Sequence, residues 1–165
     1  METLKKITVT FFYTGMIPFM PGTMGTLGAA ILYLLLWKTG IANIFLLSLI
    51  LMAACIINII FSDWAENFFQ TKDPSQVVID EVAGYFLTVL FFKPSMAVFI
   101  AAFILFRFFD ITKIYPINQC EKLSGGLGIL LDDLVSAIFA LIILFVASFF
   151  INYYNININI TPIWF

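Results

Sequence analysis

Carboxylates interrupt the apolar stretches of this chain at three places. Asp80 and Glu81 stand between Val-Val-Ile and Val-Ala-Gly-Tyr-Phe-Leu, Asp110 follows another stretch, and Asp132 and Asp133 lie near the start of the last one. Acids in apolar segments of membrane type are costly and are functional candidates by default. A buried ion pair is the structural alternative, and it is weak because the chain has 8 Lys and Arg residues against 10 acids.

These acids predict a hard divalent cation with oxygen ligands, namely Mg²⁺. The chain contains no His, which excludes His-ligated zinc, His general bases and phosphohistidine chemistry. Mg²⁺ beside Lys or Arg suits a phosphate substrate, because metal and cations neutralise the negative charge of the transition state. A phosphate site sunk at one membrane face indicates a lipid phosphate.

Arg107, Asp110 and Lys113 are spaced three apart and can share a helix face. Asp110 at a helix C-terminus is opposed by the helix dipole and needs a cation. Arg107 is the only Arg of the chain, and its planar guanidinium suits bidentate phosphate contact. A network of snorkelling side chains at the membrane interface explains this segment equally well.

A glycine-rich segment, Ser124-Gly125-Gly126-Leu127-Gly128, precedes Asp132 and Asp133. Such a segment leaves backbone N–H groups free at a helix N-terminus, where they can hold an anion. Glycines also mark ordinary turns, so the run alone is a weak signal. Together with two acids it favours a site.

The composition predicts that helices in a membrane must position these residues. The chain of 165 residues is 62% hydrophobic and 11% charged, with a mean hydropathy of +1.06. Soluble domains are about 45–50% apolar and about 25% charged. We expect one integral-membrane domain over residues 1–165. The net charge of −2 and the lack of a basic cluster exclude nucleic acid as a partner.

Five apolar stretches cover residues 22–37, 41–61, 77–92, 95–109 and 128–151. Only helices cross lipid with every backbone group paired, and a span needs about 20 apolar residues. We therefore expect an all-α membrane protein, a bundle of about five transmembrane helices plus an N-terminal interfacial or half-inserted helix over residues 7–20. A signal peptide is the weaker interpretation of that first run.

The ends of three segments allow further predictions. The third helix begins either with Asp73 as its cap, in a capping-box-like sequence, or nearer Val78, which would place Asp80 and Glu81 in its first turn. Residues 152–165 are expected to form an interfacial tail. Cys55 and Cys120 lie in an apolar run and a polar loop, so a disulfide framework is not expected.

A cytoplasmic N-terminus with five helices places six cations inside and only Lys38 and Lys93 outside, as the positive-inside rule requires. The same topology places all 10 acids on the inner side. Longer inner loops would account for Asp63 and Glu66, but not for the acids that abut apolar helices. The site is therefore expected to face the cytoplasm.

The chain resembles the phosphatidylglycerophosphatase A family in four motifs that occur in the family's order, roughly between Gly15 and Ala140. The matching residues are Pro21-Gly22-Thr23-Met24-Gly25-Thr26, Asp80-Glu81-Val82-Ala83-Gly84, Phe106-Arg107-Phe108-Phe109-Asp110 with Lys113 and Pro116, and Gly125-Gly126-Leu127-Gly128-Ile129 with Asp132-Asp133. The resemblance implies a Mg²⁺-dependent phosphatase that converts phosphatidylglycerophosphate to phosphatidylglycerol at the inner membrane of a bacterium. The chain has Lys113-Ile114 where the family commonly reads Lys-Pro.

The resemblance also implies residue roles. Asp80, Glu81, Asp132 and Asp133 are expected to be catalytic and, with Asp110, to bind the metal. Arg107 and Lys113 are the expected phosphate binders. Thr23 adds a hydroxyl to the phosphate site or, alternatively, caps the first long helix.

Two chemical steps fit these acids. In the first, which we favour, Mg²⁺ lowers the pKa of a water and a carboxylate acts as general base. In the second, an Asp attacks phosphorus to give an aspartyl-phosphate. Two functions compete with the phosphatase: a small ion- or proton-coupled transporter, because intramembrane acids also mark ion pathways, and a structural subunit. Transporters usually bind at the midplane between repeats, and no internal repeat is visible here.

Overall fold

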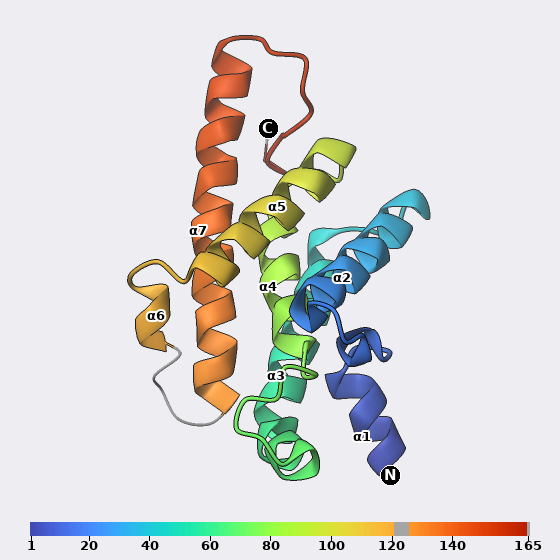
Figure 1. The fold of residues 1–165 in the computed structure, drawn as a ribbon. Coiled ribbons are helices and arrows are strands. Elements are labelled where there is room, and N and C mark those ends of the chain that lie inside the picture. The colour runs from blue at the N-terminus through green and yellow to red at the C-terminus, as the bar shows by residue number, and fades with distance from the viewer. Residues whose placement is uncertain (121–125, 165) are drawn as a thin grey trace.

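The computed structural model describes residues 1–120 and 126–164, and every regular element in this part of the chain is a helix. The prediction of an all-α protein is therefore confirmed. Figure 1 shows the helices as one bundle, with the first helices and the last long helix on opposite sides of it. The elements are α1 (Glu2–Val9), the short η1 (Thr14–Met16), α2 (Pro21–Lys38), α3 (Ile44–Phe69), α4 (Ile79–Val89), α5 (Met96–Thr112), α6 (Ile117–Cys120) and α7 (Gly126–Tyr153).

Two of the described helices are long and apolar enough to cross a membrane. They are Ile44–Phe69 in α3 and Leu127–Tyr153 in α7, and each contains an 18-residue stretch with a mean hydropathy of 2.9. Only 17% and 28% of these stretches are buried inside the protein, whereas a core helix of a soluble protein would be mostly enclosed. Their exposed apolar faces need an apolar surrounding, which a lipid bilayer supplies. The count of about five transmembrane helices stays a prediction.

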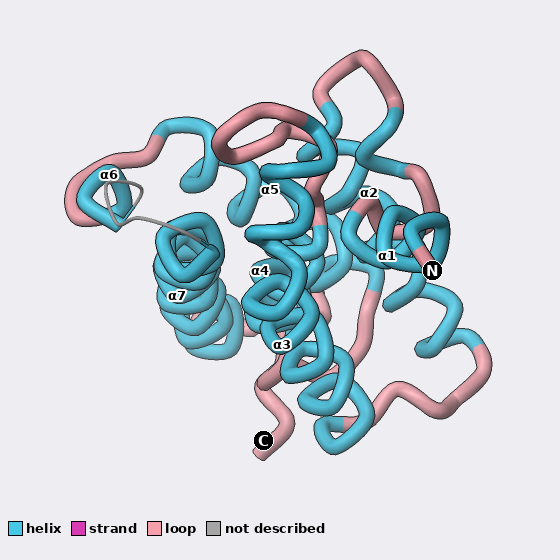
Figure 2. The backbone as a smooth tube through the Cα atoms, turned by 90° about the horizontal axis from the view of Figure 1, so that it is seen from below, coloured by secondary structure: helices cyan, strands magenta, loops and turns pink. Residues whose placement is uncertain are grey.

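The short helix α4 occupies the centre of the bundle. It contacts α2, α3, α5 and α7 (Figure 2), and 9 of its 11 residues are buried. Eleven residues rise about 16 Å, about half of a bilayer core of about 30 Å. Gly84 permits close packing, since a Cβ there would lie 2.4 Å from a ring carbon of Phe106 on α5. The space beside this glycine is filled by a neighbouring helix.

The structure decides where α4 begins. The helix starts at Ile79, with Val78 preceding it and no side-chain cap, so the capping-box interpretation of Asp73 is wrong. Val78 N–H donates instead to the carbonyl of Val9, at 3.0 Å, which ties this start to the end of α1. Asp80 and Glu81 therefore lie in the first turn, where the helix dipole favours negative charge.

The N-terminal segment differs from the expected helix over residues 7–20. Helix α1 ends at Val9, and Phe11, Phe12 and Tyr13 all have positive φ angles. Such angles are unfavourable in a helix for non-glycine residues, so the chain turns before η1. Whether this segment lies in the membrane interface stays a prediction.

The last turns of α3 carry Asp63 and Glu66, which a loop was expected to hold. The apolar stretch that predicted this helix stops at residue 61, but the helix continues for eight residues to Phe69. Its extension keeps one face buried, because Ser62 and Ala65 face the protein. Cys55 and Cys120 are both free, as expected, although Cys120 lies in α6.

Residues 156–164 fold back against the connection between α4 and α5 (Figure 1). Phe92 and Pro162 form an isolated antiparallel bridge, and Lys93 N–H donates to Thr161 O at 2.8 Å. The Trp164 ring stacks on Phe145 of α7, with ring centroids 5.4 Å apart. The segment predicted as an interfacial tail thus also fastens the end of α7 to the bundle.

Candidate active site

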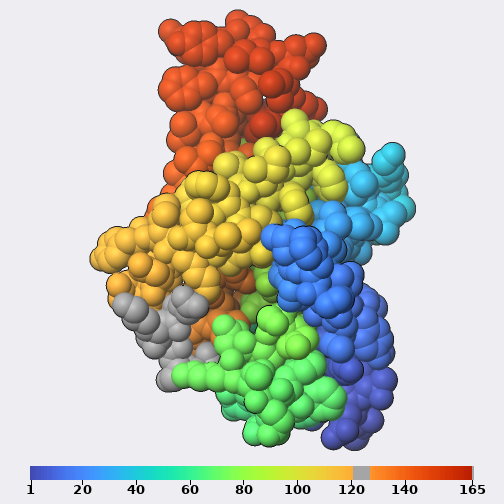
Figure 3. Space-filling view, viewed as in Figure 1, coloured from blue at the N-terminus to red at the C-terminus, as the bar shows by residue number. Residues whose placement is uncertain are grey.

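A cavity of about 430 Å³ opens near the start of α7 and the start of α4. The surface is hollowed between the end of α5 and the loop that precedes α4 (Figure 3). The ends of α4, α5 and α7 and that loop supply its charged wall. The charged residues that line it are Asp73, Asp80, Glu81, Arg107, Asp110, Lys113, Asp132 and Asp133. All five predicted metal-binding acids and both predicted cationic phosphate binders are therefore brought together.

The first turn of α4 presents Asp80 and Glu81 to this cavity. Asp80 is 4% exposed, and its Oδ1 accepts a hydrogen bond from Glu81 N–H at 3.0 Å. The Glu81 side chain is 14% exposed, and its Oε2 is buried without a hydrogen-bond partner in the described structure. An unpaired buried carboxylate oxygen is strongly unfavourable, so this atom points to a ligand.

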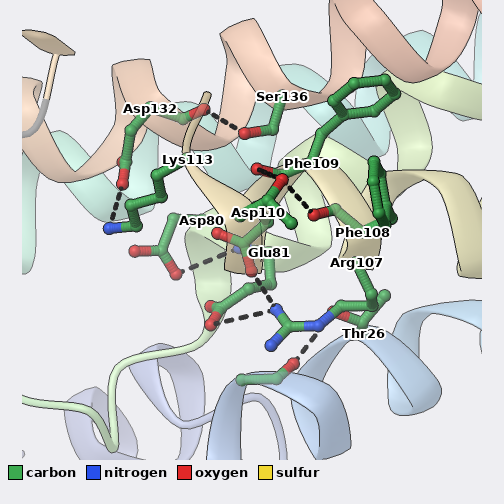
Figure 4. Close-up of polar contacts among 12 residues, drawn as sticks. Thr26, Asp80, Glu81, Arg107, Phe108, Phe109, Asp110, Lys113, Asp132 and Ser136 are labelled. Atoms are coloured by element: carbon green, nitrogen blue, oxygen red, sulfur yellow. Dashed lines mark hydrogen bonds and ion pairs between the residues drawn. The ribbon is translucent and has the colours of Figure 1, made fainter. Parts of the chain in front are cut away.

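Helix α7 contributes Asp132 and Asp133, which are both buried. The Asp132 carbonyl accepts a hydrogen bond from Ser136 Oγ at 2.7 Å, one turn later (Figure 4). Consecutive helical residues point about 100° apart. Asp132 and Asp133 therefore reach different parts of the same cavity.

The end of α5 supplies Arg107 and Asp110. Arg107 Nη1 donates to Asp110 Oδ2, and the same nitrogen lies 4.0 Å from Glu81 Oε1 (Figure 4). This confirms that Asp110, opposed by the helix dipole, is paired with a cation. Arg107 Nε is buried and has no hydrogen-bond partner among the described residues, so the guanidinium keeps an unused donor.

Lys113 reaches the site by leaving the helix. It is the residue that ends α5, with a φ of 42° in the left-handed region, and its Nζ lies 2.9 Å from Asp132 Oδ2. The three-residue spacing predicted that Lys113 shares a helix face with Arg107 and Asp110. This prediction is wrong, because Lys113 lies at the end of the helix. The turn at the helix end carries its ammonium to α7 instead.

Gly22 is a cavity residue that sequence reasoning did not place in the site. It lies in the first turn of α2 and lines the cavity. A Cβ at this position would lie 2.3 Å from Glu81 Oε1 and 3.2 Å from Arg107 Nη1. The motif that begins at Pro21 was the available signal, because it places a glycine in the first turn of a helix. The absence of a side chain lets α2 approach the acids.

Thr23 is placed differently from both sequence interpretations. It does not cap α2, since Met20 holds that position, and it is not among the residues that line the cavity. Its hydroxyl is buried without a partner among the described residues. The loop before α4 adds Asp73 and Ser75 to the cavity wall instead. The sequence did not predict this, because polar residues are common in loops and do not by themselves indicate a site.

The acids form two groups whose geometry fits a metal ion. One is Asp80, Glu81 and Asp133, and the other is Asp110, Asp132 and Asp133; within each group, one carboxylate oxygen of every residue lies within 4.8 Å of the others. Carboxylate oxygens are the ligands of Mg²⁺ and other hard cations. A cation would also give the buried oxygen of Glu81 a partner. The predicted glycine-rich anion site covers residues 124–128, and its first two residues lie outside the described residues.

Comparisons with known proteins agree on one family. The sequence model described as Phosphatidylglycerophosphatase A matches residues 7–148. A protein of Bacteroides thetaiotaomicron, provisionally named a phosphatidylinositol-3-phosphatase, is 34% identical over 90% of this chain and 96% of its own length. The proteins named Phosphatidylglycerophosphatase A from Haemophilus influenzae and Escherichia coli are 37% and 29% identical, over 84% and 81% of this chain and 85% and 77% of their own lengths. No solved structure matches the chain.

Proposed function

Because the chain belongs to the phosphatidylglycerophosphatase A family, we propose that it hydrolyses phosphatidylglycerophosphate to phosphatidylglycerol and phosphate in a Mg²⁺-dependent reaction. One observation carries the proposal: six carboxylates, an arginine and a lysine line a single cavity near the ends of four helices. A lipid can present its headgroup to such a cavity while its acyl chains stay among the exposed apolar side chains. The chain is thus a phosphoric monoester hydrolase of phospholipid metabolism.

The proposed ligands of Mg²⁺ are Asp80, Glu81, Asp110, Asp132 and Asp133. When bound, Mg²⁺ would offset the charge of the phosphate and make a water molecule more acidic. Their burial supports this role, because charges interact more strongly where water is excluded.

Arg107 and Lys113 would bind the phosphate oxygens. Both side chains already lie at the cavity wall, and both hold carboxylates that a metal ion could take over. The guanidinium would offer a planar pair of donors and the ammonium a point charge. These contacts would stabilise the negative charge that is spread over the phosphoryl oxygens in the transition state.

The proposed chemical step is attack by water on phosphorus, with breakage of the bond to the glycerol oxygen. A cavity carboxylate accepts the proton of the attacking water, and the departing glycerol oxygen takes up a proton to become the hydroxyl of phosphatidylglycerol. Hydrolysis in ¹⁸O-labelled water under single-turnover conditions tests this step. Labelled phosphate, with no phosphorylated chain after acid quenching, is the expected result. Label in an enzyme carboxylate, or a phosphorylated chain, would establish attack by an Asp side chain.

We propose a cytoplasmic-membrane location in a bacterium, with the cavity toward the cytoplasm. The bacterial relatives and the two apolar helices support it. In Figure 1 the start of the chain lies at the lower end, whereas α2 ends and α4 joins α5 higher up. Lys38 and Lys93 belong to those upper segments, as the proposed orientation requires.

The experiment uses the full chain purified in detergent with Mg²⁺. Inorganic phosphate should be released from phosphatidylglycerophosphate faster than from phosphatidylinositol 3-phosphate. The second lipid is included because the Bacteroides relative is named for its hydrolysis. The reverse preference would overturn the proposed substrate. No release from either lipid would favour the transporter, which a proteoliposome ion-flux assay then measures directly.

A further inference from the structure

We propose that the cavity holds two divalent cations and that Asp133 is a ligand of both. This inference rests on the proposed Mg²⁺-dependent function and adds the number of ions and the residue that joins them. It follows from how three helices divide the acids between them.

Asp133 is the one acid common to both potential metal groups among the described residues. Its partners in the first group, Asp80 and Glu81, come from α4. Its partners in the second are Asp110, from the end of α5, and the adjacent Asp132. A carboxylate has two oxygens and can therefore contact two cations at once. Asp133 is also 4% exposed, so its charge needs compensation on the protein side.

The first group contains an independent sign of a missing ligand. Glu81 Oε2 is buried and has no hydrogen-bond partner in the part of the chain that the structure describes, although Glu81 Oε1 faces Arg107 Nη1 at 4.0 Å. The guanidinium thus faces only one of the two oxygens. A cation between Glu81, Asp80 and Asp133 would pair the other.

The second group is held differently, because cationic side chains already contact it. Lys113 contacts Asp132 and Arg107 contacts Asp110, so these acids are kept in place without a metal. A divalent cation in this group would replace those contacts with stronger ones. Arg107 and Lys113 would then be able to turn toward a phosphate.

The charge balance favours two ions over one. The six carboxylates, one arginine and one lysine that line the cavity carry a formal charge of −4. One divalent cation leaves the cavity at −2, which would repel a phosphate monoester, whereas two bring it to neutrality. Two-metal sites in phosphatases use the ions as a clamp on attacking and leaving oxygens, so the second ion has a chemical use as well as an electrostatic one.

Binding of Mn²⁺, a paramagnetic substitute for Mg²⁺, tests the inference on the full chain in detergent. Equilibrium dialysis should find two Mn²⁺ per chain, and electron paramagnetic resonance should show a spin-coupled pair. Asp133→Asn should abolish the coupling. Asp80→Asn and Asp110→Asn should each weaken a different binding step, by at least about tenfold, since even indirect partners of a metal contribute that much.

Asp63→Asn is the matched control, because Asp63 is an exposed acid near the end of α3 that does not line the cavity. It should bind two coupled ions as the wild type does. Circular dichroism of each variant checks that the helices are retained. A single Mn²⁺ per wild-type chain, two uncoupled ions, or coupling that persists in Asp133→Asn would overturn the inference.

These outcomes are separate from those that test the proposed function. A chain that binds two coupled ions but releases no phosphate from phosphatidylglycerophosphate would contradict the function and leave the metal pair standing. A chain that hydrolyses this lipid with one bound ion would contradict the metal pair and leave the proposed function standing.

Discussion

Lys113 Nζ lies 2.9 Å from Asp132 Oδ2, so the residue that ends α5 is joined to the second turn of α7. The left-handed backbone at Lys113 makes this contact possible, because it turns the chain out of the helix. The lysine side chain is 30% exposed and the aspartate 9%. The ammonium therefore sits at the rim of the cavity, within reach of an incoming phosphate.

Lys113→Met should raise KM for the lipid phosphate and lower kcat/KM by about 10- to 100-fold, because a donor to the phosphate is lost. Steady-state release of phosphate measures both constants. Lys38→Met removes an exposed lysine that does not line the cavity and should leave them unchanged. Equal effects of the two substitutions would show that only general surface charge matters.

Asp80→Asn should lower phosphate release by about 10²- to 10³-fold, the usual effect of removing a key electrostatic group. The Asn carbonyl can still accept the hydrogen bond from Glu81 N–H. The variant also removes one charge from a crowded acidic cluster, so its Tm in EDTA should equal or exceed that of the wild type. A large drop in Tm in EDTA would instead assign Asp80 a structural role.

Chelation by EDTA should abolish phosphate release, and added Mg²⁺ should restore it. Because the ligands come from three helices, Mg²⁺ should also stabilise the fold, by about 2.7 kcal/mol at 100 times its Kd. Thermal unfolding with and without Mg²⁺ measures this. Asp133→Asn should show a much smaller rise in Tm, and an equal rise would place the ion elsewhere.

Gly22→Ala should lower kcat/KM, because its Cβ would lie 2.3 Å from Glu81 Oε1. Either α2 or the carboxylate must then move. Gly28→Ala is a control on the same helix, since its Cβ would meet Thr14 and Phe11 at 3.1–3.2 Å and not the acids. Gly28→Ala should alter Tm more than activity. If both variants lost activity equally, Gly22 would have no specific role in the site.

Deletion of residues 156–165 should lower Tm but preserve most phosphate release. The segment contacts the connection between α4 and α5 and the later part of α7, whereas the acids lie near the start of α7. The bridge of Phe92 with Pro162 and the stacking of Trp164 on Phe145 would be lost. Complete loss of activity in a deletion variant that keeps its helices would show that residues 156–165 influence the cavity.

The sequence predicted the site better than the bundle. Acids inside apolar stretches are informative because a membrane makes every such charge costly, and Asp80, Glu81, Asp110, Asp132 and Asp133 all line one cavity. The sequence predicted α4 as one of about five transmembrane helices. An apolar run of this kind does not show whether lipid or protein surrounds it. The structure shows that protein surrounds α4, because 9 of its 11 residues are buried and Gly84 packs against Phe106.

Two other residues illustrate the limit of local patterns. The three-residue spacing placed Lys113 on the face of Arg107, but a single left-handed residue redirects it to α7. Thr23 carries a suitable hydroxyl but does not line the cavity, and its neighbour Gly22 does. Side-chain chemistry suggested Thr23, whereas the site required the residue without a side chain.

The acids reach the cavity from α4, α5 and α7, and α7 is the last helix. A chain interrupted during synthesis before residue 132 would carry Asp80, Glu81 and Asp110 but neither aspartate of α7. Such a fragment would lack members of both metal groups. Under the proposed function, a chain therefore gains its full set of metal ligands only when α7 has been made, and a chain interrupted earlier would be unable to hydrolyse phospholipids.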